Sequence, residues 1–185
     1  MKSNFLRYYF RTFFQPQSVF DELLTDQSHF LYGFGFIAIP SVLYTLMYVL
    51  LTIGNGAPSS FTPWLNIPMD VYYSYNRFLL IPSLLLSWIF AAGTIQILAK
   101  FVEGKGTFEH TLSVLALAVS VAMWSTLLHD LIMSFLSASQ VINAREHEIA
   151  MNSPTIWRTL IWTLMIIYLL WFCVLFSKAT AAVHK

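Results

Sequence analysis

Charged residues are scarce in this chain. Only 10% of its 185 residues are Asp, Glu, Lys or Arg, whereas soluble domains average roughly 25%. So few charges cannot cover a water-facing surface, and a net charge of +1 gives no electrostatic basis for binding nucleic acid. The composition therefore excludes an ordinary soluble domain and predicts an integral membrane protein with the lipid bilayer as its first partner.

Cysteine is almost absent as well. Cys173 is the single cysteine, and one thiol cannot form an intrachain disulfide, so cysteine usage gives no information on the redox compartment. The residue lies inside an apolar run, where we expect a buried structural thiol.

Catalytic motifs are also lacking. The chain contains no nucleophile elbow, no His-Glu-x-x-His and no pair of intramembrane aspartates. The sequence therefore predicts that the protein is not an enzyme and uses no cofactor.

Long apolar runs are what the chain does contain. A bilayer is crossed by roughly 20 apolar residues in a helix, and four segments reach that length: 29–53, 78–102, 111–136 and 156–177. They predict an all-α transmembrane helical bundle with four spans over residues 29–185. Residues 1–28 are predicted to form a separate interfacial segment on the cytoplasmic face.

The N-terminal segment has the pattern of an amphipathic helix. At helical period, one face collects apolar residues and another collects polar ones: Leu6, Tyr9, Phe10 and Phe13 against Asn4, Arg7 and Arg11. Such a helix suits the headgroup plane, with its cations near lipid phosphates. Pro16 is expected to end it, and Ser18 to be the N-cap of a second short helix.

The distribution of cations predicts the orientation. With four spans, both termini and the middle loop share one side, and that side holds seven of the ten Lys and Arg residues, namely Lys2, Arg7, Arg11, Lys100, Lys105, Lys178 and Lys185. The excess predicts cytoplasmic termini. Trp64, Trp157 and Trp162 fit an aromatic belt at the opposite surface.

The third predicted span carries two rows of small residues, which mark close helix packing in membranes. One row holds Ser113, Ala116 and Ser120, and the other includes Ala118 and Ala122. We expect this helix to lie between neighbours, with one row available to another copy or another membrane protein.

Two polar pairs near the end of the third span and in the next loop are the candidates for a metal site: His129 with Asp130, and His147 with Glu148. Histidine and carboxylate ligands could bind zinc. Adjacent residues on a helix point apart, however, so only a fold of the loop would bring the pairs together. The alternative is a solvated polar rim.

The segment "EGKGTFEH", residues 103–110, interrupts the apolar sequence. It contains Gly-Lys without the spacing of a phosphate-binding loop. We predict a tight cytoplasmic turn in which Gly104 and Gly106 take positive φ, Lys105 anchors the cytoplasmic side, and Thr107 or Thr111 caps the next helix.

The same segment carries a family resemblance. "GKGTFEHTLSVLALA" resembles the signature of the Yip1 domain family, a Gly-rich turn with a Phe and a Thr-Leu-x-Val pair entering a membrane helix. The N-terminal "FFQPQSVFDELLTD" is similar to that family's entry segment. Members of the family commonly have five spans, whereas four are found here, so the number of spans stays open.

The resemblance implies a polytopic membrane protein without known catalysis. Eukaryotic members act in vesicle trafficking and bind small GTPases. The short N-terminal region here is more similar to prokaryotic members of the cytoplasmic membrane, some of which resemble accessory subunits of export systems. Two functions follow as expectations: a membrane adaptor acting on another membrane protein or on itself, or a small oligomeric channel or transporter.

Overall fold

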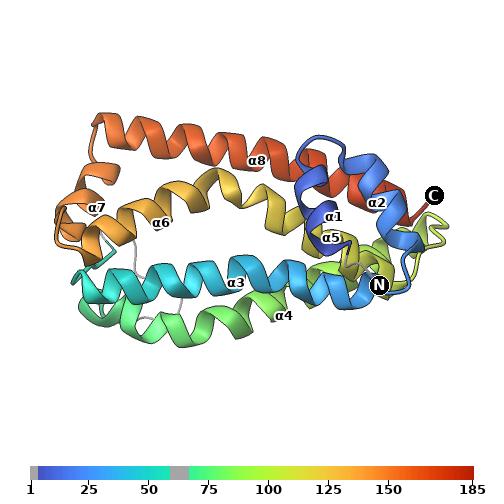
Figure 1. Ribbon diagram of the computed structural model, residues 1–185, viewed down its shortest axis with the longest axis horizontal. Coiled ribbons are helices and arrows are strands. Elements are labelled where there is room, and N and C mark those ends of the chain that lie inside the picture. The colour runs from blue at the N-terminus through green and yellow to red at the C-terminus, as the bar shows by residue number, and fades with distance from the viewer. Residues whose placement is uncertain (1–3, 59–66) are drawn as a thin grey trace. The chain divides into compact units, whose positions relative to one another are not determined.

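The computed structural model describes residues 4–58 and 67–185, and these consist of helices without strands. Lys2 and Trp64 lie outside the described residues. The α-helices, labelled in Figure 1, are α1 (Phe5–Thr12), α2 (Pro16–Thr25), α3 (His29–Ile53), α4 (Tyr72–Phe101), α5 (Phe108–Ala122), α6 (Trp124–Ala138), α7 (Ala144–Asn152) and α8 (Ile156–Val183). A 3₁₀ turn, η1 (Met69–Val71), precedes α4. The predicted all-α class is confirmed.

Three described helices are long and apolar enough to cross a membrane: His29–Ile53, Met69–Phe101 and Ile156–Val183. The predicted span 111–136 is not one continuous helix, because the chain breaks at Met123 between α5 and α6. These two form a bent pair that makes a fourth span if they cross together. The second and fourth spans were predicted too short, since α4 begins at Tyr72 and α8 continues to Val183.

The chain divides into two compact units. The first contains Met1–Pro40, Leu84–Met123 and Leu169–Lys185, and the second contains Ser41–Ser83 and Trp124–Tyr168. The helices α3, α4 and α8 each contribute a segment to both. Residues 1–28 were predicted to lie at the membrane surface and residues 29–185 to cross the membrane. The two compact units do not test this division, which stays a prediction.

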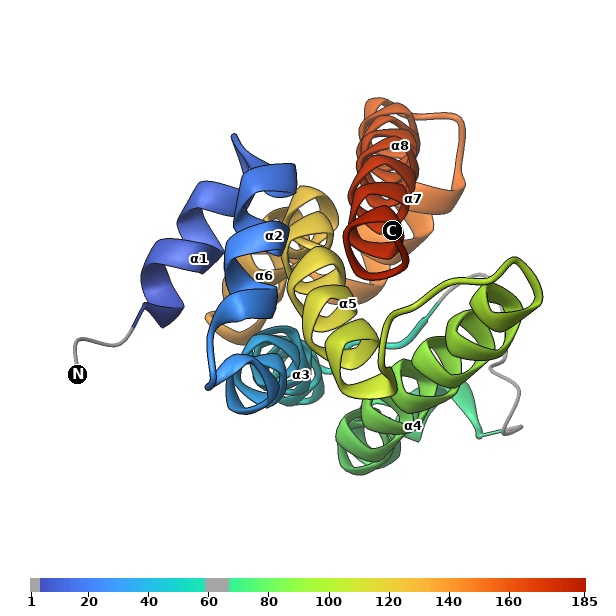
Figure 2. The same ribbon diagram turned by 90° about the vertical axis from the view of Figure 1, so that its right-hand side faces the viewer.

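In the first unit, α1 and α2 pack on α5, and Figures 1 and 2 both show the three side by side. The α2 side chains Val19, Phe20 and Leu23 are fully buried. Pro16 was predicted to end α1, but it is the first residue of α2. Proline is favourable there because the first helical position makes no intrahelical hydrogen bond through its N–H. The N-cap of α2 is Gln15 rather than Ser18.

The predicted apolar face of α1 is divided between core and surface. Tyr9 is buried and its hydroxyl lies 3.0 Å from Ser120 Oγ, whereas Leu6 and Phe10 are both 61% exposed. The two arginines bind Glu22 of α2: Arg11 Nη1 at 2.8 Å and Arg7 Nη2 at 3.2 Å from Glu22 Oε2. Intramolecular pairs therefore engage the cations that were predicted to contact lipid phosphates.

The second unit contains η1, α6, α7 and segments of α3, α4 and α8. Asn143 caps α7, since its Oδ1 accepts hydrogen bonds from the backbone N–H groups of Arg145 and Glu146 at 3.0 and 3.3 Å. The Arg145 guanidinium binds Asp70 Oδ1 at 2.7 Å and the Asn55 carbonyl at 3.2 Å. These bonds hold the start of α7 against η1 and the end of α3.

One further sequence expectation is wrong. Cys173 is exposed on α8 rather than buried. An apolar run in a membrane helix need not be covered by protein, because lipid covers it instead.

Candidate functional site

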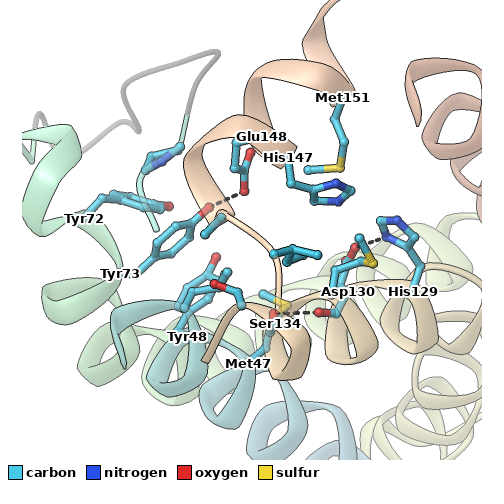
Figure 3. Close-up of a pocket in the computed structure, with 16 residues that line it drawn as sticks. Met47, Tyr48, Tyr72, Tyr73, His129, Asp130, Ser134, His147, Glu148 and Met151 are labelled. Carbon is cyan, nitrogen blue, oxygen red and sulfur yellow. Dashed lines mark hydrogen bonds and ion pairs between the residues drawn. The ribbon is translucent and has the colours of Figure 1, made fainter. Parts of the chain in front are cut away.

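A cavity of about 270 Å³ lies in the second unit, among residues of α3, α4, α6 and α7. Figure 3 shows its lining side chains. Its walls combine aromatic, thioether and ionisable groups: Tyr48, Tyr72 and Tyr73; Met47, Met133 and Met151; His129, Asp130, His147 and Glu148. Pockets that hold small ligands have this mixture of apolar walls and a few convergent polar groups.

Glu148 and Tyr73 form one polar wall of the cavity. The Tyr73 hydroxyl donates a hydrogen bond of 2.7 Å to Glu148 Oε1, and Tyr73 is only 7% exposed. Burial raises the pKa of Glu148 above the usual range, the charge of Asp130 raises it further, and the hydrogen bond from Tyr73 opposes both. Glu148 therefore retains its proton to higher pH than an exposed glutamate.

Two histidines form another wall. The His129 and His147 ring centroids lie 5.8 Å apart, and His129 Nδ1 lies 2.9 Å from Asp130 Oδ1. Burial lowers the pKa of His147, the charge of His129 lowers it further, and that of Asp130 opposes both. The Nε2 atoms of both rings are buried without a hydrogen-bond partner within the described residues.

The fold thus brings all four metal-site candidates from the sequence, His129, Asp130, His147 and Glu148, to one cavity. His129 and Asp130 were expected to point apart, but they contact each other at 2.9 Å because side-chain torsions can turn neighbouring rings and carboxylates together. Within the described residues, no group of three or more His, Cys, Asp and Glu side chains is arranged to hold a metal ion.

Sequence reasoning missed the tyrosine and methionine walls of this cavity. The segment "VYYSY", residues 71–75, is a visible aromatic cluster at the start of α4. Its link to α7 depends on a contact between residues 75 positions apart, Tyr73 and Glu148. No local pattern indicates such a contact.

The glycine turn after α4 belongs to the first unit, whereas the cavity belongs to the second. Gly104 and Gly106 do not take positive φ, so that prediction is wrong. Glu103 does, at 62°. Glycine is needed at 106 for space, because a Cβ there would lie 2.6 Å from the carbonyl oxygen of Val183. Lys105 is exposed, and Thr107 caps α5 by accepting a bond of 3.3 Å from the His110 N–H.

Both small-residue rows of α5 are buried inside the first unit. Each of the five predicted packing residues is at most 1% exposed: Ser113, Ala116, Ser120, Ala118 and Ala122. Gly33 of α3 approaches closely enough that a Cβ there would lie 3.0 Å from the Ser113 Cα. Neither row is therefore available to another molecule in this conformation.

The family model of the Yip1 domain matches residues 10–185, from α1 to the C-terminus. The chain belongs to the Yip1 domain family. No curated protein and no solved structure matches it. Together with the apolar helices, the match makes this a multi-pass membrane protein of the Yip1 type.

Proposed function

We propose that this Yip1-type protein is a non-enzymatic adaptor, an accessory subunit for membrane trafficking or an export system. We place it in the cytoplasmic membrane of a prokaryote with both termini in the cytoplasm. The seven-to-three distribution of Lys and Arg supports the orientation with cytoplasmic termini.

The main support for the adaptor proposal is that polar side chains around α5 make hydrogen bonds within the protein. Gln96 of α4 donates a bond of 2.6 Å to the Gly106 carbonyl and accepts one of 3.0 Å from Thr111. Ser113 Oγ lies 3.0 Å from His29 Nδ1. A conduction path needs polar groups that face water, whereas these groups bond to one another.

The surface of α8 supports an action through a partner. In its most apolar stretch only 6% of the residues are buried, and large apolar side chains such as Ile166 and Leu170 are 53% and 65% exposed. In a bilayer this surface contacts lipid or the helix of another membrane protein. The adaptor proposal assigns part of it to a partner helix.

Flux and cross-linking test the proposal together. Purified protein in sealed liposomes should show no ion or small-solute flux above empty vesicles. A photo-cross-linking residue at exposed Leu170 should give a specific protein adduct in native membranes, and the same residue at Leu175, which is fully buried, should not. Flux that disappears in Gln96→Ala would instead support the small oligomeric channel, and lipid adducts alone at Leu170 would contradict the adaptor role of this surface.

A further inference from the structure

Two helices of the second unit each carry a histidine followed four residues later by a methionine. The pairs are His129 with Met133 on α6 and His147 with Met151 on α7. Residues four apart share one face of a helix, and all four side chains line the same cavity. Figure 3 shows Met151 and the two imidazole rings gathered in one part of that cavity.

The spacing of the two rings suits one ion held between them. Their centroids are 5.8 Å apart and both Nε2 atoms are buried without a hydrogen-bond partner in the described chain. An imidazole nitrogen binds a metal ion at about 2.0–2.1 Å, which puts the centroids of two rings on one ion roughly 5–6 Å apart. Buried polar atoms usually have a partner, and a shared ion would supply one to each ring.

Asp130 orients His129 for such a role. Its Oδ1 lies 2.9 Å from His129 Nδ1. When the ring donates this bond from Nδ1–H to the carboxylate oxygen, Nε2 is the nitrogen that presents a lone pair. Metal-binding histidines commonly donate their second N–H to a carboxylate in this way.

The remaining ligands indicate which metal. Thioether sulfur is a soft ligand that selects Cu(I), and imidazole also suits copper. The harder carboxylate of Glu148 already accepts the hydrogen bond from Tyr73. We propose that the two His–Met pairs bind one Cu(I) ion between α6 and α7. This site is additional to the adaptor role, and either proposal can fail without the other.

Cu(I) binding is measured on the full-length protein in mild detergent. The background variant is Cys173→Ser, because the exposed thiol would itself bind Cu(I). Anaerobic titration with ascorbate and a chromophoric Cu(I) chelator should show one ion per chain. X-ray absorption of the loaded protein should show both nitrogen and sulfur ligands. Absence of binding, or a copper spectrum without sulfur, would overturn the proposal.

Matched variants locate the site. Exchange of methionine for leucine conserves volume and usually preserves folding. The double variant Met133→Leu/Met151→Leu should weaken Cu(I) binding at least tenfold, while Met47→Leu, in the same cavity but in neither pair, should leave it unchanged. Asp130→Asn should weaken binding by about 10- to 100-fold, as loss of an orienting partner does.

Further outcomes separate this site from other metal binding. Equal affinities in the double variant and Met47→Leu would overturn the proposal, as would tighter binding of Zn²⁺ than of Cu(I) in the same assay. If thermal unfolding shows that the double variant does not fold, the X-ray absorption of the Cys173→Ser protein decides whether methionine binds the ion. That measurement needs no substitution at the proposed ligands.

Discussion

At the scale of single residues, Gly106 is required for the close contact between the turn after α4 and the end of α8. A Cβ at this position would meet the Val183 side chain and lie 2.6 Å from its carbonyl oxygen. Real Cβ atoms do not approach so closely, and backbone cannot move aside as a flexible side chain can.

We therefore expect Gly106→Ala to destabilise the protein by about 1–3 kcal/mol, the usual range for overpacking. The neighbouring change Lys105→Ala serves as control, because Lys105 is exposed and should tolerate truncation. The measurement is thermal unfolding of both variants in the same detergent. Identical transition temperatures for the two variants would contradict the steric explanation.

Glu148 gives a prediction for the pH dependence of stability. Its pKa is raised in the folded protein, chiefly by burial. As the pH rises above the ordinary glutamate value of 4.5, the unfolded chain loses this proton first, so the folded state loses stability until the pH has passed the raised pKa.

Glu148→Gln keeps the shape of the protonated side chain and removes its titration. The stability of the native protein relative to Glu148→Gln should therefore fall as the pH rises above 4.5. Because His147 is present in both proteins, its own titration largely cancels in the comparison. Unfolding temperatures measured from pH 4 to 8 test this, and a constant difference would show that the pKa of Glu148 is not raised in the folded protein.

At the scale of the elements, α1 was correctly predicted as an amphipathic helix, but its division between core and surface was not. Leu6, Phe10 and Phe14 follow one another at intervals of four residues and are 61%, 61% and 87% exposed. Between them, Tyr8, Tyr9 and Thr12 are buried, and α1 packs on α2 and α5. The exposed apolar stripe, rather than the paired arginines, is thus the side suited to the bilayer.

Spin labels can test this assignment of the α1 stripe. A label on Phe10→Cys, in the Cys173→Ser background, should collide with oxygen dissolved in the bilayer more often than with a water-soluble nickel complex. A label on Gln15→Cys, an exposed polar position nearby, should show the reverse. Equal preference for nickel at both sites would mean that α1 lies clear of the membrane.

The pair α5 and α6 shows the limit of local sequence patterns. No proline or glycine occurs between Phe108 and Ala138, so nothing in the apolar run indicates that the helix breaks at Met123. Hydropathy measures length and composition, and the two together still pass as one span. The break falls where the chain passes from one compact unit to the other, since Met123 ends a segment of the first and Trp124 begins a segment of the second.

At the scale of the whole molecule, the number of spans and the orientation of the chain are testable together. We expect four crossings, with α5 and α6 as one of them, and both termini in the cytoplasm. Reporter domains fused after Lys185 and inserted in the loop that follows α3 should therefore lie on opposite sides. Reporters on the same side would mean an even number of spans after that loop, as in the total of five spans that is common in this family.

The sequence by itself determined the class of this protein, because scarce charge and long apolar runs leave a helical membrane bundle as the stable arrangement. It also located the residues that carry the family match and the four ionisable side chains of the cavity. Only the tertiary structure decided that those four meet, that Gly106 is needed for space, and that both rows of α5 are covered. Each of these depends on contacts between residues far apart in the chain, which helical periodicity does not encode.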